Sequence, residues 1–129
     1  MEKNLLDFVK EAKRQIEEIS IADFLKMIEE DDEVLILDVR EESEYAMGHI
    51  ENAVLVPRGT LEGAADPTYK LHNQELCVAR ERPIVVYCAS GGRSALAAAT
   101  LKQMGFMLVY NLLGGIELWH AEDNPVISN

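Results

Sequence analysis

The residues best suited to chemistry lie in one short segment, Cys88-Ala89-Ser90-Gly91-Gly92-Arg93-Ser94. A cysteine becomes a nucleophile when its thiol has lost the proton. Two consecutive glycines allow backbone angles that other residues avoid, so that successive N–H groups can curl around an anion. An apolar run precedes the segment and an alanine-rich stretch follows it, which indicates a strand, a loop and a helix. We therefore expect the loop amides and the positive end of the helix to stabilise a Cys88 thiolate.

The charge pattern around Arg93 supports the same interpretation. A cation in the first turn of a helix opposes the helix dipole, and a bound anion would offset that penalty. The chain has a net charge of −11, yet no Asp or Glu occurs from Arg82 to Ile116. The sequence around the loop is therefore free of acids, which would allow a chain of this net charge to hold an anion there. The structural alternative is that Gly-Gly forms only a tight turn and that Cys88 is a small buried side chain.

The elements that position this loop follow from the hydrophobic pattern. Apolar runs predict buried strands at residues 34–37, 53–56, 84–87 and 107–110, and a short edge strand at 16–19. Helices are predicted at 3–14, 21–29, 41–47, 69–77, 93–104 and 114–119, with 58–83 as the least regular part. Such alternation implies an α/β fold with a central parallel sheet and helices on both faces. Ligands of such sheets bind beyond the carboxyl ends of the strands, which is where Cys88 is placed.

Length and composition predict a single domain over residues 1–129, with 1–15 as an N-terminal helical extension. Two cysteines are too few for a disulfide framework or a cysteine-rich metal site, so we expect no metal and no cofactor. The absence of a secretory signal pattern and of an apolar run near the roughly 20 residues of a membrane span predicts a cytoplasmic protein without a membrane partner. Without a basic patch, a nucleic-acid partner is not expected.

Four separated motifs, taken together, resemble the rhodanese-like domain family, in particular its single-domain thiosulfate sulfurtransferases. The resemblance covers roughly residues 16–119. Its motifs are Leu37-Asp38-Val39-Arg40 with Glu41 to Tyr45, then Gly48-His49-Ile50 with Ala53 to Pro57, then Tyr87 to Ser94, and finally Gly114-Gly115-Ile116-Glu117-Leu118-Trp119.

This resemblance implies roles for individual residues. Cys88 would take sulfane sulfur from a small anionic donor such as thiosulfate, become a persulfide, and pass the sulfur to cyanide or a thiol, including a protein thiol. The amides of Ala89 to Arg93 would stabilise the persulfide, and Arg93 would bind the donor or shape the loop. Asp38, Arg40 and Ser94 would support the loop. Arg58, in a segment that resembles a pocket wall of some members, would either contact an anionic substrate or form a surface ion pair.

Two other classes of function use the same fold. The phosphatases that share it, including arsenate-type enzymes, have a loop one residue longer than the six residues from Cys88 to Arg93, so the short loop favours sulfur. The third class is a non-enzymatic module for protein binding or redox sensing, which an intact Cys88 and Arg93 disfavour. Outside the loop, we expect His49 to be buried and hydrogen-bonded, Trp119 to lie in the core, and Glu44 to cap a helix or form an ion pair.

Overall fold

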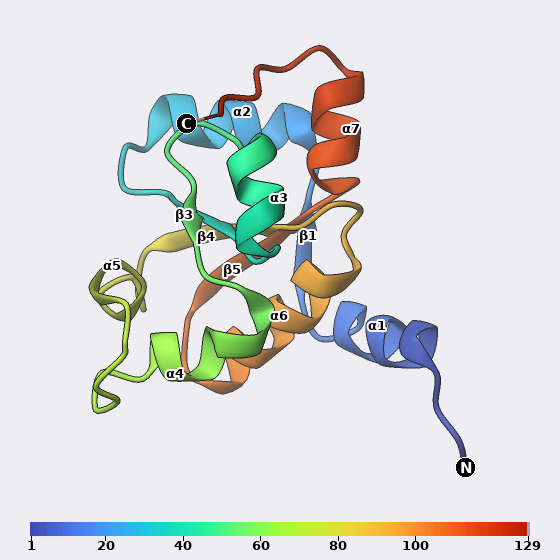
Figure 1. The fold of residues 1–129 in the computed structure, drawn as a ribbon, viewed down its shortest axis with the longest axis vertical. Helices are drawn as coiled ribbons and strands as arrows, with labels where there is room; N and C mark the ends of the chain where they lie inside the picture. The colour runs from blue at the N-terminus through green and yellow to red at the C-terminus, as the bar shows by residue number, and fades with distance from the viewer. Residues whose placement is uncertain (129) are drawn as a thin grey trace.

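The structure, a computed structural model, describes residues 1–128 and consists of one parallel sheet with helices on both sides (Figure 1). The strands lie in the order β1-β5-β4-β2-β3, and each neighbouring pair is parallel. Their bounds are Glu17–Ile19 for β1, Leu35–Asp38 for β2, Val54–Leu55 for β3, Pro83–Tyr87 for β4 and Leu108–Leu112 for β5. The predicted α/β fold with a parallel sheet is thus confirmed, and β1 is the edge strand that the sequence indicates.

The helices are α1 (Leu5–Lys13), α2 (Ile21–Glu30), α3 (Glu42–Met47), the 3-10 turn η1 (Arg58–Thr60), α4 (Leu61–Ala65), α5 (Gln74–Cys77), α6 (Gly92–Gln103) and α7 (Gly115–Ala121). The predicted helices appear in the expected order, and η1 and α4 are additional short elements that were not predicted. The helix predicted at 69–77 is wrong in its first half. It begins after Asn73, whose side chain accepts a hydrogen bond from the N–H of Leu76 and so caps α5 at that point.

Alternating residues of the central strands divide the core into two layers. Leu35 and Leu37 of β2 pack in one cluster with Leu101 of α6. Ile36, between them in sequence, packs in the other cluster with Phe24 of α2. Successive side chains of a strand point to opposite faces, so continuous apolar runs require cover on both sides. Figure 1 shows α2 and α7 above the sheet and α4 and α6 below it.

The alanine-rich face of α6 lets two helices approach closely. Ala95 and Ala99 of α6 pack in a third cluster with Val9 and Ala12 of α1, so the N-terminal helix covers the outer side of α6. This packing fixes α6, whose first turn follows the loop that leaves β4 at Tyr87. No helix within residues 1–128 combines the length and apolar character needed to cross a membrane.

Candidate functional site

Cys88 directly follows β4, which lies between β5 and β2 at the centre of the sheet. The residue is almost fully buried, with 1% of its surface exposed. Its Sγ lies 3.1 Å from the backbone nitrogen of Gly91, 3.4 Å from that of Ser94, and 3.3 Å from the hydroxyl oxygen of Ser94. Donors directed at one sulfur favour its negatively charged form over the thiol. The local geometry therefore suits a nucleophilic thiolate.

The backbone from Ser90 to Arg93 has the open amides that an anion requires. Gly91 adopts φ +118°, a left-handed conformation that favours glycine, and it caps α6. The N–H groups of Ser90, Gly92 and Arg93 have no hydrogen-bond acceptor among residues 1–128. The first amides of a helix lack partners within the helix and are ready anion donors. The loop from Ala89 to Arg93 thus presents open amides beside Cys88, and substrate binding by these residues stays a prediction.

The start of α7 holds the loop from behind. The N–H groups of Ile116 and Glu117 donate to the carbonyl oxygens of Cys88 and Ala89, at 2.9 and 3.0 Å. Gly115 has φ +60°, and a Cβ built on it would lie 2.6 Å from the Cys88 carbonyl oxygen. Only glycine fits that approach. Gly115 of the C-terminal motif therefore allows the close contact with the loop, a role that the sequence pattern did not indicate.

Arg93 is bound by an acid from another element. Its two terminal nitrogens donate to the two carboxylate oxygens of Glu44 on α3, at 2.8 and 3.0 Å. The hydrogen bond from Arg93 lowers the pKa of Glu44 to about 2. The sequence around the loop contains no acid, but folding brings a carboxylate 49 residues away in sequence to Arg93. Glu44 is the ion-pair partner that was expected, and three of the five N–H donors of Arg93 stay outside this pair.

Asp38 and Arg40 form a buried ion pair beside β4. The Asp38 side chain is fully buried and accepts from Arg40 Nε and Nη2, at 3.0 and 2.7 Å. Arg40 Nη2 also donates to the carbonyl oxygen of Gly48 at 2.7 Å, just after α3. These hydrogen bonds anchor the end of the helix that carries Glu44. Loop support by this pair stays a prediction, and it would act through α3.

Arg58 lies away from the loop. It donates to Glu62 at 3.2 Å and to the hydroxyl of Thr100 at 3.2 Å, two turns along α6 from Gly92. Its Nε is buried without a hydrogen-bond partner among residues 1–128. The ion-pair alternative describes these contacts, and contact of Arg58 with a substrate stays a prediction.

Other expected structural residues lie where predicted. His49 is 2% exposed, its Nδ1 lies 2.9 Å from the carbonyl oxygen of Tyr45, and its ring stacks on that of Tyr45. Trp119 lies in the core against Phe24. Cys77 is buried, its Sγ donates to the carbonyl oxygen of Ala64 at 3.3 Å, and both cysteines are free thiols.

Two residues that sequence reasoning missed also contact the site. Asn111 of β5 is fully buried and accepts a hydrogen bond from the Ser94 hydroxyl at 2.6 Å. It donates in turn to the Gly91 carbonyl oxygen and to Glu18 of β1. No local pattern marks either residue, because the contacts depend on the pairing of β1 with β5.

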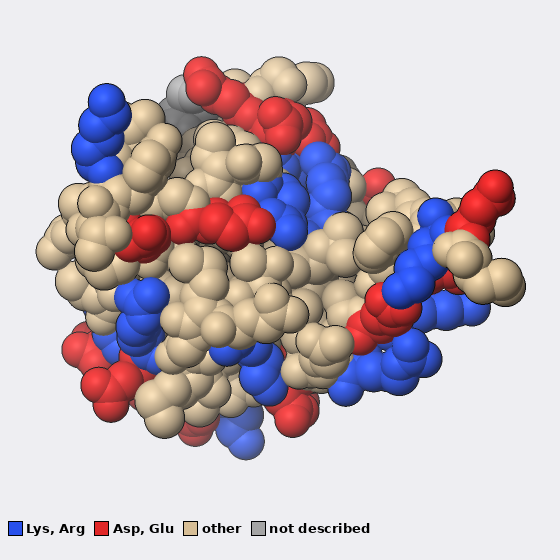
Figure 2. All heavy atoms as spheres, turned by 90° about the horizontal axis from the view of Figure 1, so that it is seen from below, with Lys and Arg blue, Asp and Glu red and all other residues tan. Residues whose placement is uncertain are grey.

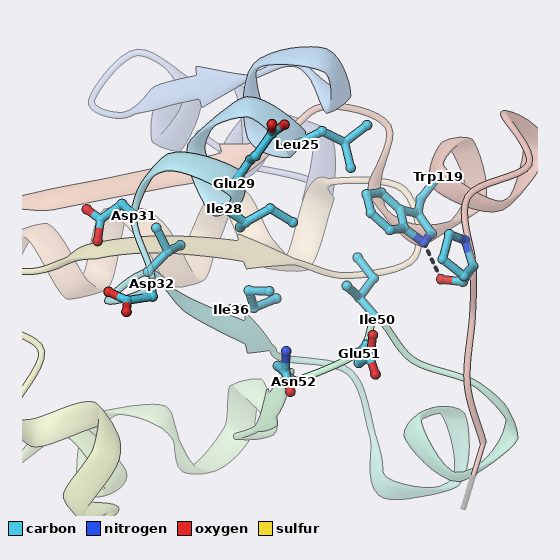
Figure 3. Close-up of a pocket in the computed structure, with 12 residues that line it drawn as sticks. Leu25, Ile28, Glu29, Asp31, Asp32, Ile36, Ile50, Glu51, Asn52 and Trp119 are labelled. Carbon is cyan, nitrogen blue, oxygen red and sulfur yellow. Dashed lines mark hydrogen bonds between the residues drawn. The ribbon is translucent and has the colours of Figure 1, made fainter.

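The surface also contains a cavity that lies away from Cys88 and its loop. This cavity of about 480 Å³ between α2, the start of β2 and α7 has an apolar floor that includes Ile36, Ile50 and Trp119, with acids at its edge (Figure 3). Neither cysteine nor any residue of the loop lines it. A groove of about 350 Å³ is lined by Glu44, Met47, Ile116 and Glu117 among others, and not by the loop itself. Its lining residues contact the loop, because Glu44 binds Arg93 and the N–H groups of Ile116 and Glu117 bind loop carbonyls.

Charges on the underside of the molecule are mixed. Figure 2 shows acidic and basic side chains interspersed on this face, with uncharged surface between the groups. Phosphate-backbone binding depends on clustered Lys and Arg. This face therefore lacks the pattern of a nucleic-acid interface.

Comparisons with known proteins agree with the geometry. The family model described as rhodanese-like domain matches residues 20–122. A protein of Allochromatium vinosum named sulfurtransferase is 30% identical over 113 residues, which cover 88% of this chain and 96% of that protein. YrkF of Bacillus subtilis is 38% identical over 104 residues, covering 81% of this chain, and the match spans 51% of YrkF, about half of its length.

A solved structure from Rhodopseudomonas palustris, described as a protein of unknown function and possible tyrosine phosphatase, superposes with a TM-score of 0.89 at 29% identity. The superposition covers 98% of this chain and 96% of the R. palustris chain. The family match spans most of the chain and contains both the loop and the start of α7 that holds it. The chain belongs to the rhodanese-like domain family.

Proposed function

We propose that this protein is a sulfurtransferase that carries sulfane sulfur as a persulfide on Cys88. The observation that carries the proposal is the position of Cys88 Sγ, which faces two backbone amides and a hydroxyl inside a loop with further open amides. A sulfur that must alternate between thiolate and persulfide needs such donors in both states. The sulfurtransferase name of the A. vinosum relative supports the same activity.

The proposed reaction has two steps. The Cys88 thiolate attacks the outer sulfur of thiosulfate, the S–S bond of thiosulfate breaks, and sulfite leaves with the bonding electron pair. A thiophilic acceptor, cyanide or a thiolate, then attacks the outer sulfur of the persulfide and releases the Cys88 thiolate. Charge balances in both steps, and no cofactor is required. Thiosulfate is the donor class that we propose first, because its negative charge suits the open amides of Ser90, Gly92 and Arg93.

The groove beside the loop is the proposed approach for donor and acceptor. Ile116 and Glu117 line it and also donate hydrogen bonds to the backbone carbonyls of Cys88 and Ala89, so the groove lies next to the residues that hold the loop. The exposed side chain of Met47 lies on the same groove. An apolar edge of this kind would also admit a protein thiol as the acceptor. We propose a cytoplasmic, reducing environment, in which both cysteines stay free thiols.

Intact-mass measurement before and after thiosulfate tests the proposal. We expect a gain of one sulfur atom on Cys88 that is lost on addition of cyanide with release of thiocyanate. Cys88→Ser is expected to lose the gain. Cys77→Ser is the matched control and should retain it, because burial raises the pKa of the Cys77 thiol. A wild-type protein that takes no sulfur from thiosulfate or from a persulfide donor would overturn the proposal.

The R. palustris neighbour supports a second candidate, a phosphatase that uses the same thiolate. The same protein should then hydrolyse p-nitrophenyl phosphate through a phosphocysteine on Cys88. We expect no such turnover, because the loop from Cys88 to Arg93 has six residues, one fewer than the loop of the phosphatases that share the fold. Cys88-dependent hydrolysis without persulfide formation would replace the proposed sulfur transfer with phosphate chemistry. Failure of both reactions would favour the binding or redox-sensing module.

A further inference from the structure

A chain of hydrogen bonds runs from the edge of the sheet to the cysteine. Asn111 Nδ2 donates to Glu18 Oε2 at 2.9 Å. The Ser94 hydroxyl oxygen lies 2.6 Å from Asn111 Oδ1 and 3.3 Å from Cys88 Sγ. Ser94 and Asn111 are both fully buried, so water does not compete for these contacts. Glu18, on β1, is partly exposed at the outer end of the chain.

The orientation of the Asn111 amide follows from its other partners. Its NH₂ group faces Glu18 Oε2 and the Gly91 carbonyl oxygen, the latter at 3.2 Å. A carboxylate and a carbonyl can only accept hydrogen bonds, so both N–H donors of Asn111 must point toward them. Rotation of the amide by 180° would place Oδ1 of Asn111 against Glu18 Oε2 and the Gly91 carbonyl oxygen, neither of which can donate a hydrogen bond. Asn111 Oδ1 is therefore held toward Ser94.

The Ser94 hydroxyl has one proton and two acceptors within reach. It can donate to Asn111 Oδ1 or to Cys88 Sγ, but not fully to both. When the proton points to Asn111, the lone pairs of Ser94 face the sulfur, which suits an S–H group and opposes a thiolate. When the proton points to Cys88, it stabilises the thiolate. The short distance to Asn111 favours the first arrangement until the sulfur becomes charged.

We propose that Asn111, held in place by Glu18, is a positioning residue that competes with Cys88 for the Ser94 hydroxyl and so limits the fraction of Cys88 present as thiolate. Its importance for catalysis rests on the proposed function, in which the thiolate is the nucleophile. The ionisation itself can be measured without any sulfur donor.

The proposal predicts opposite effects at adjacent members of the chain. Ser94→Ala removes a donor from the thiolate and should lower the thiolate fraction. Asn111→Leu removes the competing acceptor, so that Ser94 donates to Cys88, and should raise it. A hydrogen bond to a charged group corresponds to about a tenfold change in the ionisation equilibrium. General damage to the loop would not produce opposite signs.

The measurement is the ultraviolet absorbance of the thiolate as a function of pH, in a Cys77→Ser background so that Cys88 is the single cysteine. The double variant Ser94→Ala/Asn111→Leu decides the route. If Asn111 acts through Ser94, the increase caused by Asn111→Leu is absent when Ser94 is alanine. The proposal is overturned if the thiolate fraction still increases in the double variant. It is also overturned if Asn111→Leu alone changes the thiolate fraction by less than about twofold.

Glu18→Ala provides a second test on a partly exposed edge position, where folding is less at risk. Glu18→Ala removes the acceptor that holds the Asn111 side-chain amide, so the thiolate fraction should rise, as it does in Asn111→Leu. The increase should be smaller than in Asn111→Leu and should be absent when Ser94 is alanine. No change in thiolate fraction would overturn the role of Glu18 in holding Asn111. A protein that titrates as predicted but forms no persulfide keeps this inference and loses the proposed function. A protein that forms the persulfide, but whose thiolate titration is the same in all variants, keeps the proposed function and loses this inference.

Discussion

Glu44 binds Arg93 through both carboxylate oxygens, at 2.8 and 3.0 Å, and thereby ties α3 to the first turn of α6 beside Cys88. The two residues are 49 positions apart in sequence. The pair places a negative charge next to a loop that is proposed to bind anions. We therefore expect it to affect both the stability of the fold and the affinity for a donor, and each effect can be measured.

The ion pair should make stability depend on acid pH. Since its hydrogen bond to Arg93 lowers the pKa of Glu44 from 4.5 to about 2, the pair stabilises the folded state above pH 4.5. This contribution is lost as the pH falls from 4.5 toward 2. Both side chains are about one-third exposed, so we expect only about 0.5–1 kcal/mol. In urea unfolding, the difference between wild type and Glu44→Gln should shrink across that range. Glu42→Gln, an exposed neighbour on α3, is the control, and an equal pH dependence in both variants would contradict the assignment.

The same substitution tests whether Arg93 contacts the donor. Glu44→Gln removes a negative charge and frees donors of Arg93, so the KM for thiosulfate should fall about two- to fivefold. Raising the ionic strength should reduce the difference, because salt screens partly exposed charges. Steady-state kinetics at two salt concentrations measure this. An unchanged or increased KM would mean that Arg93 shapes the loop rather than binding the donor.

Breaking the buried pair of Asp38 and Arg40 should be costly. Arg40→Met leaves the fully buried Asp38 carboxylate without its cation, at a cost of about 3–5 kcal/mol in the free energy of unfolding. The double variant Asp38→Leu/Arg40→Met should recover part of that loss. Glu62→Gln, which breaks the exposed pair with Arg58, is the comparison and should cost about 0–1 kcal/mol. Similar losses for the buried and the exposed pair in urea unfolding would contradict this prediction.

Gly115→Ala should displace the loop from Cys88 to Arg93. Its Cβ would lie 2.6 Å from the carbonyl oxygen of Cys88, and φ of +60° is strained for alanine. We expect about 1–3 kcal/mol of destabilisation together with loss of sulfur transfer. Gly59→Ala is the matched control, because no heavy atom lies within 4 Å of the added Cβ. If Gly115→Ala retained the activity of Gly59→Ala, contact between α7 and the loop would not be needed for the reaction.

Much of the fold could be predicted from local patterns. The apolar runs of β2 and β4 and the glycines after Cys88 have local effects, so periodicity and backbone preferences decide the structure there. The helix expected at 69–77 failed in part because a side-chain cap at Asn73 decided its first residue. The irregular stretch 58–83 contains η1 and α4, whose few turns depend on packing under α6 rather than on pattern.

The sequence by itself determined the parallel α/β order and the position of Cys88 at the carboxyl end of a central strand. Both follow from hydrophobic periodicity and from the chemistry of one contiguous loop. Only the tertiary structure decided which side chains surround that loop. Glu44 reaches Arg93, and Glu18 reaches Asn111 across 93 positions, because parallel strand pairing brings together residues that no local pattern links. Hydrogen-bond partners depend on distances of a few ångströms in space, and spacing along the chain does not encode them.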